Sequence, residues 1–146
     1  MENIIVSACL LGLSCRYDGR SKPCQAVLEL LKEESIRLIP VCPEQLGGLP
    51  TPRIASERKG SRVIMGDGHD VTKQYQKGAQ EALKLAHLYA CKKAILKEKS
   101  PSCGCGRIYD GSFSRTLMDG NGVTAELFLS DGIEVIGETL LPGIGE

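Results

Sequence analysis

Apolar residues gather in short continuous runs along the chain, separated by stretches with helical spacing or by polar, glycine-rich segments. The runs rich in isoleucine, valine and leucine cover residues 3–9, 36–42, 93–97 and 133–137. Runs of this length are typical of strands that are buried on both faces of a sheet. A further short strand is expected at 61–66, where the Gly66-Asp67-Gly68 turn follows.

Helical spacing of apolar residues occurs in the segments 24–34, 72–90 and 123–131. The clearest pattern lies in 72–90, where Tyr75, Ala79, Ala82 and Ala86 recur on one face. Thr72 is expected to cap the first turn of this helix.

Two long segments, 43–60 and 99–122, are rich in glycine or proline and are predicted as loops. The alternation of strands and helices predicts an α/β fold, a Rossmann-like three-layer sandwich whose mostly parallel sheet is flanked by helices. A chain of this length is expected to form a single domain, residues 1–146. Long loops inside a compact domain are uncommon and are often functional.

Composition narrows the class of partner. Eighteen basic and eighteen acidic residues cancel, so the charge favours neither a nucleic acid nor a membrane surface. Without tryptophan and with six other aromatic residues, the chain offers little platform for stacking bases along a strand. No apolar stretch reaches about 18 residues, and the start lacks the pattern of a signal peptide. We therefore expect a cytoplasmic protein with a small-molecule partner.

Seven cysteines are many for a reduced compartment, and an odd number fits poorly with a closed set of disulfides. Three of them follow predicted strands: Cys9, Cys42 and Cys103. Because the carboxyl ends of parallel strands meet at one edge of a sheet, these thiols are expected to converge there. Thiolates favour zinc, copper(I) and iron–sulfur clusters, and three ligands leave a coordination position open for catalysis. The alternative is that Cys9 and Cys42 are small apolar core residues.

The other four cysteines carry weaker signals. Cys105 lies two positions beyond Cys103, where a residue of an extended loop points the other way, so we interpret it as a bystander or a redox-labile thiol. Cys15 follows the first strand and is a spare thiol near the expected site. Cys24 and Cys91 lie in or at the ends of helices, and we interpret both as structural.

Polar side chains accompany two of the strand-end cysteines. Glu44 lies two residues beyond Cys42, and a carboxylate beside a Lewis-acidic metal can act as a general base toward water. Spacing alone favours the alternative, an exposed loop glutamate. The stiff turn at 47–53 presents Thr51 and Arg53, and the guanidinium is suited either to a substrate oxygen or to an internal carboxylate.

Taken together, several stretches of the chain resemble a known family. They are Ser7-Ala8-Cys9-Leu10-Leu11-Gly12, Cys15-Arg16-Tyr17-Asp18-Gly19, Val41-Cys42-Pro43-Glu44, Gly47-Gly48-Leu49-Pro50-Thr51-Pro52-Arg53, Asp70-Val71-Thr72, Gly78-Ala79, Ser100-Pro101-Ser102-Cys103-Gly104, Tyr109-Asp110-Gly111 and Gly122-Val123-Thr124-Ala125. The chain is similar, from Ile4 to about residue 138, to the small bacterial family that includes thiouracil desulfidase.

The resemblance implies a [4Fe-4S] cluster held by Cys9, Cys42 and Cys103, with a fourth iron free to take the substrate's sulfur. It also implies that Glu44 activates water and that Ser100 is the second polar catalytic group. The expected reaction is non-redox hydrolysis of a carbon–sulfur bond in a thiolated base such as thiouracil. Arg53, Thr51 and Ser102 are the candidate substrate-binding residues.

Three other functions compete with this one. The same cysteines suit a zinc protein, either structural or hydrolytic, and zinc can also replace an oxygen-sensitive cluster. A second alternative is a module that carries or senses a cluster without turnover. A thiol redox protein is disfavoured because the chain has no Cys-x-x-Cys motif.

Overall fold

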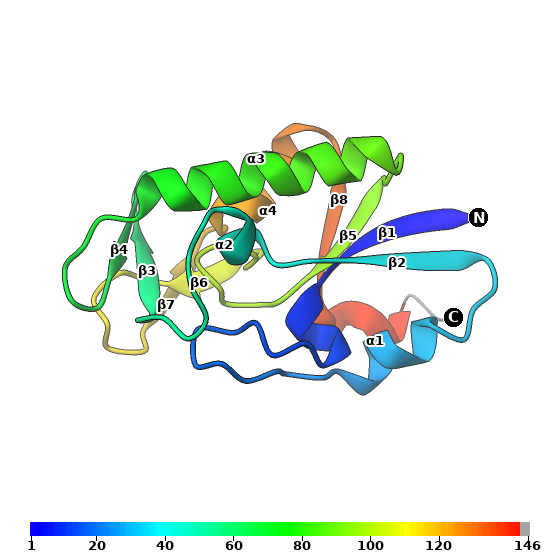
Figure 1. Ribbon diagram of the computed structural model, residues 1–146, viewed down its shortest axis with the longest axis horizontal. Coiled ribbons are helices and arrows are strands. Elements are labelled where there is room, and N and C mark those ends of the chain that lie inside the picture. Colours follow the sequence, from blue (N-terminus) through cyan, green and yellow to red (C-terminus); the bar gives the residue numbers. More distant parts are fainter. Residues whose placement is uncertain (144–146) are drawn as a thin grey trace.

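The computed structural model describes residues 1–143. Its centre is a four-stranded sheet in the order β2-β1-β5-β8, in which every neighbouring pair is parallel (Figure 1). The strands are β1 (Glu2–Ser7), β2 (Ile36–Val41), β5 (Lys93–Leu96) and β8 (Glu134–Gly137). The four apolar runs therefore form one parallel sheet, as predicted. The number of domains is not tested by this topology and stays a prediction.

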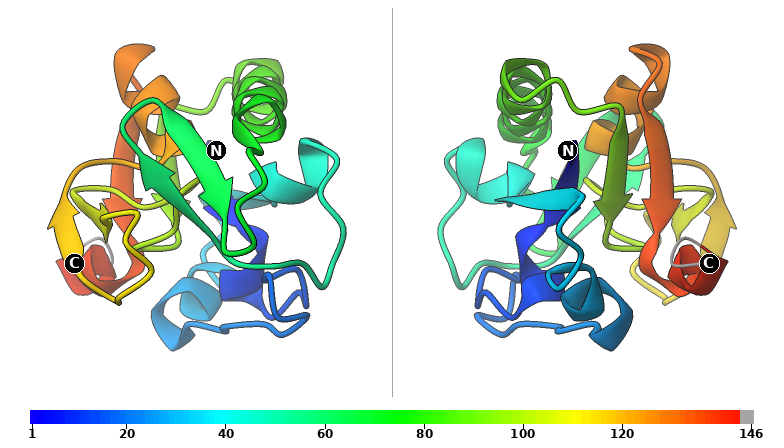
Figure 2. Two further views of the ribbon diagram at one scale, coloured as in Figure 1. Left: turned by 90° about the vertical axis from the view of Figure 1, so that its left-hand side faces the viewer. Right: turned by 90° about the vertical axis from the view of Figure 1, so that its right-hand side faces the viewer.

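Helices cover both faces of the sheet (Figures 1 and 2). On one face lie α3 (Thr72–Leu88) and α4 (Val123–Ser130), and on the other lie α1 (Gln25–Leu30) and the 3-10 turns η1 (Ala8–Leu11) and η2 (Glu138–Gly143). The expected three-layer α/β fold is confirmed. None of the described helices is long and apolar enough to cross a membrane.

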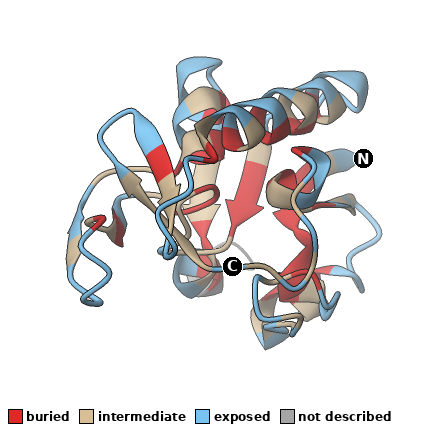
Figure 3. Ribbon diagram, turned by 60° about the vertical axis from the view of Figure 1, so that its left-hand side comes forward, coloured by how far each residue is buried: buried red, intermediate tan, exposed pale blue. Residues whose placement is uncertain are grey.

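Strand β1 shows why the sheet is buried on both sides. Alternate side chains of a strand point to opposite faces. Ile5 packs in the core beneath α3 and α4, whereas Ile4 and Val6 pack in a second core on the side of α1. All three are almost fully buried, which explains why this strand is a continuous apolar run rather than an alternating one. Figure 3 shows that buried residues, in red, predominate in the central strands.

The two segments predicted as loops contain regular structure, so this prediction is wrong in part. The first holds helix α2 (Pro43–Leu46) and strand β3 (Ser56–Lys59), which pairs antiparallel with β4 (Arg62–Met65). The second holds the antiparallel strands β6 (Arg107–Tyr109) and β7 (Leu117–Asp119). These pieces have three or four residues each. Elements so short carry no periodic pattern that the sequence could display.

Three element boundaries also differ from expectation. Strand β1 ends at Ser7, so Cys9 lies in the 3-10 turn that follows it. Helix α1 ends at Leu30, because the polar segment 32–35 has no apolar side to bury. Thr72 does not cap α3: the capping residue is Val71, and the backbone N–H of Thr72 is instead bonded to the Asp70 carboxylate.

Helix α2 packs closely against α3 at two glycines. A Cβ on Gly78 of α3 would overlap the carbonyl oxygen of Pro43, and one on Gly47 would overlap the carbonyl oxygen of Gln74. Hydrogen atoms in place of side chains therefore let the two helices touch backbone to backbone. This contact fixes the start of α2, where Cys42 and Glu44 lie, relative to α3.

Candidate functional site

A cavity of about 510 Å³ lies beyond the carboxyl ends of β1, β2 and β5. Its walls come from the segments that directly follow these strands and from β3 and the 109–115 loop. Ligand sites in open α/β sheets occupy this position, because strand ends and loop residues converge there. The cavity is therefore the candidate site.

The three strand-end cysteines all line this cavity. Cys9 comes from η1 and is buried, Cys42 immediately precedes α2 and is half-buried, and Cys103 lies in the turn after β5 and is buried. The structure thus brings together thiols that are far apart in the sequence. No disulfide joins any of the cysteines, which are all free.

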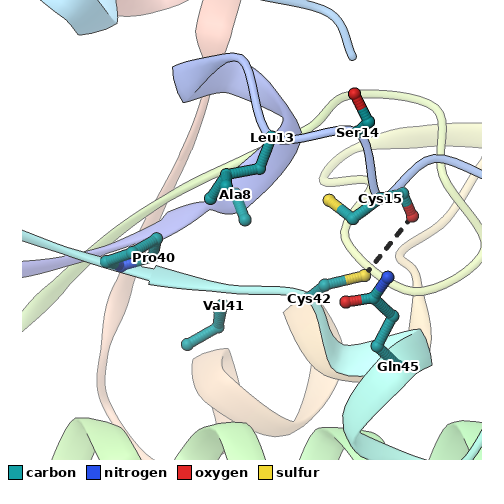
Figure 4. Close-up of a pocket in the computed structure, with 8 residues that line it drawn as sticks. All are labelled: Ala8, Leu13, Ser14, Cys15, Pro40, Val41, Cys42 and Gln45. Carbon is teal, nitrogen blue, oxygen red and sulfur yellow. Dashed lines mark hydrogen bonds between the residues drawn. The ribbon is translucent and has the colours of Figure 1, made fainter. Parts of the chain in front are cut away.

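Cys15 is a fourth thiol in the same cavity, whereas the sequence predicted only a spare thiol near the site. Its carbonyl oxygen lies 3.7 Å from Sγ of Cys42, beside a smaller hollow of about 330 Å³ (Figure 4). A contact with Cys42 lowers the pKa of Cys15, but a contact with Cys9 and burial outweigh it and raise the pKa to about 11. The pKa of Cys42 is raised by the Cys15 contact and by burial.

Three thiols around one cavity are a donor set that suits a metal cluster. Within residues 1–143, no three His, Cys, Asp or Glu side chains are arranged to hold a single ion. A cluster instead offers a separate iron atom to each thiolate, so its ligands stand further apart around a cavity. Six basic and three acidic side chains line the cavity, and this positive excess favours thiolates and an anionic cluster.

Glu44 lies in the cavity wall, and two donors hold one of its oxygens. Nε of Arg53 donates to Oε1 over 3.1 Å, and the hydroxyl of Tyr75 donates to the same Oε1 over 2.7 Å. Among residues 1–143, no donor is hydrogen-bonded to Oε2. Glu44 is therefore an oriented cavity carboxylate on α2 and not the exposed loop glutamate that spacing alone favoured.

Arg53 is an internal anchor. Its side chain is 3% exposed, and besides Glu44 it donates to the carbonyl oxygens of Pro50 and Cys15 and to the hydroxyl of Thr51. Of the two uses the sequence left open for this guanidinium, pairing with an internal carboxylate is the one observed. Thr51 does not line the cavity; its hydroxyl links Arg53 to Gln45.

Sequence reasoning missed Tyr75, which it interpreted only as part of the apolar face of α3. The ring is 1% exposed, but its hydroxyl reaches the cavity wall. Burial, followed by the charge of Glu44, raises the pKa of this phenol, so it stays a donor. A tyrosine rather than a phenylalanine in an apolar stripe was the available signal, since a buried hydroxyl needs a partner.

Ser100 lines the cavity and organises the turn that carries Cys103. Its Oγ accepts the backbone N–H groups of Ser102 at 3.0 Å and Cys103 at 3.1 Å. Because both bonds use Oγ as the acceptor, the hydroxyl proton of Ser100 remains available for donation. Burial raises the pKa of Cys103 to about 12, although a bond from Ser7 acts in the opposite direction.

The amino end of α4 is hydrogen-bonded to the turn that carries Cys103. Backbone N–H groups of Val123 and Thr124 donate to the carbonyl oxygens of Pro101 and Ser102, each at 2.8 Å. Ser102 does not line the cavity: it is buried, and its hydroxyl is bonded to that of Thr124 at 2.8 Å. The hydroxyl of Ser102 is thus bonded within the protein and does not line the cavity, where a substrate contact was expected.

The remaining cysteines lie outside the cavity wall. Cys105 packs against the core beneath α3 and α4, and its thiol faces the carbonyl oxygen of Val135 at 3.9 Å. Cys91 is buried in that same core, and Cys24 packs in the core on the side of α1. Their surroundings are those of small apolar side chains.

Comparison with known proteins identifies the family of the chain. The family model described as 2-thiouracil desulfurase matches residues 4–139. The uncharacterized protein YbbK of Bacillus subtilis (strain 168) is 39% identical over 151 residues, which span 97% of this chain and 99% of that protein. A solved structure, the [4Fe-4S]-dependent thiouracil desulfidase TudS, has a TM-score of 0.93 and 47% sequence identity, covering 99% of this chain and 96% of that one. The chain belongs to the 2-thiouracil desulfurase family.

Proposed function

We propose that this chain is an iron–sulfur-dependent desulfidase that removes sulfur from a thiocarbonyl compound such as thiouracil. The observation that carries the proposal is the meeting of three strand-end thiols and an oriented carboxylate in one cavity. The likeness to TudS, a [4Fe-4S]-dependent thiouracil desulfidase, supports it over 99% of the chain.

Cys9, Cys42 and Cys103 are the proposed ligands of a [4Fe-4S] cluster. When bound through three thiolates, such a cluster supplies a Lewis-acidic iron with an open position for the thiocarbonyl sulfur. Cys15 lines the same cavity but is left out of the proposed ligand set, because the resemblance to the family implies only the other three cysteines as ligands.

Glu44 is the proposed general base. Oε1 is held by Arg53 and Tyr75, which leaves Oε2 to take a proton from water as the oxygen attacks the thiocarbonyl carbon. Ser100 donates its hydroxyl proton to the ring or to the departing sulfur. The carbon–sulfur bond is replaced by a carbon–oxygen bond and sulfide leaves, so the reaction consumes water and transfers no net electrons.

The test uses protein purified and reconstituted without air. Iron and acid-labile sulfide are counted, and sulfide release from 2-thiouracil is measured. Cys9→Ser, Cys42→Ser and Cys103→Ser should each lose iron, whereas Cys15→Ser, Cys91→Ser and Cys105→Ser should retain it. Iron content unchanged by all of the first three replacements would reject the proposed ligand set.

Glu44→Gln separates the base from the cluster. This variant should keep its iron and lose about 10²–10⁴-fold in turnover, the usual contribution of a general base. Wild-type turnover in this variant would remove Glu44 from the mechanism. One bound zinc without labile sulfide would instead favour the zinc protein, and an intact cluster without turnover would favour the sensing module.

The proposed setting is the cytoplasm, where thioredoxin and glutathione keep thiols reduced. All seven cysteines are free, which suits such a compartment. The proposed partner is a free small molecule, since the cavity volume of about 510 Å³ lies in the range of small-ligand sites.

A further inference from the structure

The few aromatic residues of the chain are concentrated at the candidate site. The sequence contains four tyrosines and two phenylalanines. Four of these six line the cavity: Tyr17, Tyr75, Tyr109 and Phe113. So few aromatic residues disfavour the stacking of successive bases along a strand, but a single planar ring needs only one aromatic face, and the fold gathers four of the six aromatic residues around one cavity.

Phe113 is the one phenylalanine among the four aromatic residues that line the cavity, and the other three are tyrosines, whose rings carry a hydroxyl group. Tyr75 is almost fully buried and its hydroxyl is bonded to Glu44, while the guanidinium of Arg16 lies 5.7 Å over the ring of Tyr17. Phe113 is 42% exposed and has no polar group to account for that exposure. Its ring rests against Gly66, where an added Cβ would meet Cε1 of Phe113 at 3.7 Å.

The backbone around Phe113 is held in an unfavourable conformation. Phe113 has φ 58° and Arg115 has φ 60°, in the left-handed region that costs side-chain-bearing residues free energy. Such conformations persist only where surrounding contacts enforce them, and they cluster at ligand sites. The loop is closed by a bond from the Asp110 N–H to the carbonyl oxygen of Thr116 at 2.9 Å.

Glu57 accepts the hydrogen bonds that hold the backbone of this loop in its conformation. Its Oε1 accepts the backbone N–H of Gly111 at 3.0 Å and that of Phe113 at 3.1 Å. Glu57 lies on β3 and itself lines the cavity, so it ties the loop directly to the cavity wall. A charged acceptor that takes two backbone donors is a strong, directional anchor.

We propose that Phe113 is a specificity-determining residue that stacks on the planar heteroaromatic ring of the substrate, and that Glu57 is the positioning residue that holds it there. This inference rests on the proposed function and narrows its substrate class to ring thiocarbonyls. Stacking places no demand on the sulfur, so it acts equally on the substrate and on the desulfurised product ring.

The test measures binding of uracil, the product ring, to cluster-loaded protein by calorimetry, together with kcat and KM for 2-thiouracil. Phe113→Ala should weaken uracil binding and raise KM by about ten-fold, as loss of one aromatic stacking face does. Phe113→Tyr should restore binding, and Phe113→Leu should fall between, because it keeps bulk but lacks a planar face. Tyr89→Ala is the matched control, since Tyr89 is 43% exposed and lies outside the cavity.

Glu57→Ala tests the anchor. It should weaken uracil binding like Phe113→Ala, and the double variant should be no weaker than either single one, because both remove the same ring contact. Additive losses would show that Glu57 acts independently of Phe113 and would overturn its positioning role. Glu57→Gln keeps an oxygen acceptor and should recover part of the affinity.

Two outcomes would overturn the stacking role and leave the desulfidase function intact. In the first, the wild-type protein turns over 2-thiouracil but binds no uracil. In the second, the Phe113→Ala variant binds uracil with the same affinity as the wild type. Wild-type protein with a complete cluster and no thiouracil turnover, in which uracil binding still depends on Phe113, would reject the proposed function and retain the ring site.

Discussion

Oη of Tyr75 lies 2.7 Å from Oε1 of Glu44, across the contact between α3 and α2. The two residues are 31 positions apart in the sequence. Because burial raises the pKa of Tyr75, the phenol keeps its proton and donates it in the hydrogen bond to the carboxylate. A buried helix residue thus orients a carboxylate of the cavity wall whose other oxygen has no hydrogen-bond donor among residues 1–143.

Removal of the phenol hydroxyl of Tyr75 tests how far the orientation of Glu44 depends on this hydrogen bond. Tyr75→Phe keeps the ring and its packing but loses the hydrogen bond to a charged acceptor. We expect a loss of roughly 1.5–3 kcal/mol in unfolding free energy. Turnover of 2-thiouracil should fall by about ten-fold with unchanged iron content. Denaturant unfolding and steady-state kinetics measure the two effects; equal kcat in the variant would mean that Arg53 alone orients Glu44.

Arg53 is expected to resist replacement by lysine. Lysine keeps the charge but offers no planar fork, so most of the four hydrogen bonds of Arg53 are lost in a buried place. The expected destabilisation is about 2–3 kcal/mol, at about 1 kcal/mol for each lost bond.

The matched control for Arg53→Lys is Arg107→Lys, whose side chain is 59% exposed and pairs loosely with Asp119 at 3.6 Å. An exposed pair contributes about 0–1 kcal/mol, so this variant should unfold nearly like the wild type. Urea unfolding of both proteins measures the difference. Equal stability of the two variants would contradict the anchoring role of Arg53.

Replacement of Gly78 by alanine is expected to lower the stability of the protein, although alanine is usually favoured over glycine in helices. In an exposed helix interior, alanine is more stable than glycine by about 1 kcal/mol. Here the added Cβ overlaps the carbonyl oxygen of Pro43 and forces α2 away from α3. We expect a net loss of about 1–3 kcal/mol, typical of overpacking, together with reduced turnover. Gln80→Ala, at an exposed position of α3, is the control and should be neutral or slightly stabilising.

Asp70 gives the protein a defined acid sensitivity. Hydrogen bonds from the hydroxyl and backbone N–H of Thr72, with the charge of Arg62, lower the pKa of Asp70 to about 2, from an unfolded value near 3.8. A depressed folded pKa adds stability that is present above the unfolded value and is lost as pH falls through about 2. Melting temperatures of the wild type and Asp70→Asn should therefore differ above pH 4 and converge between pH 4 and 2.

Arg62→Gln is the companion variant for this measurement. It removes only the guanidinium, so the convergence should persist over a narrower range, driven by Thr72 alone. Parallel melting curves of the wild type and Asp70→Asn at every pH would show that Asp70 ionises alike in the folded and unfolded chains.

The apolar runs and the three cysteines that follow them were sufficient to predict the parallel sheet and the convergence of thiols at its edge. Both follow from local rules: a strand buried on two faces must be continuously apolar, and parallel strands end on the same side. Cys9, Cys42 and Cys103 could thus be placed from the sequence because each is tied to its own strand.

Other parts of the site depend on contacts that no local pattern encodes. The partner of Glu44 on α3, the anchoring of the Phe113 loop by Glu57 and the nearness of Cys15 to Cys42 each join separate segments. The small antiparallel pairs β3-β4 and β6-β7 are likewise too short to show periodicity.

The sequence by itself determined the parallel sheet, the edge at which the cavity lies and the thiols that gather there, because those follow from the burial of each strand. Only the tertiary structure decided which groups orient Glu44, which aromatic residues line the cavity and which polar side chains lie outside it. Hydrogen bonding and stacking require distances of a few ångströms between segments, and the chain reaches those distances only after its helices have packed on the sheet.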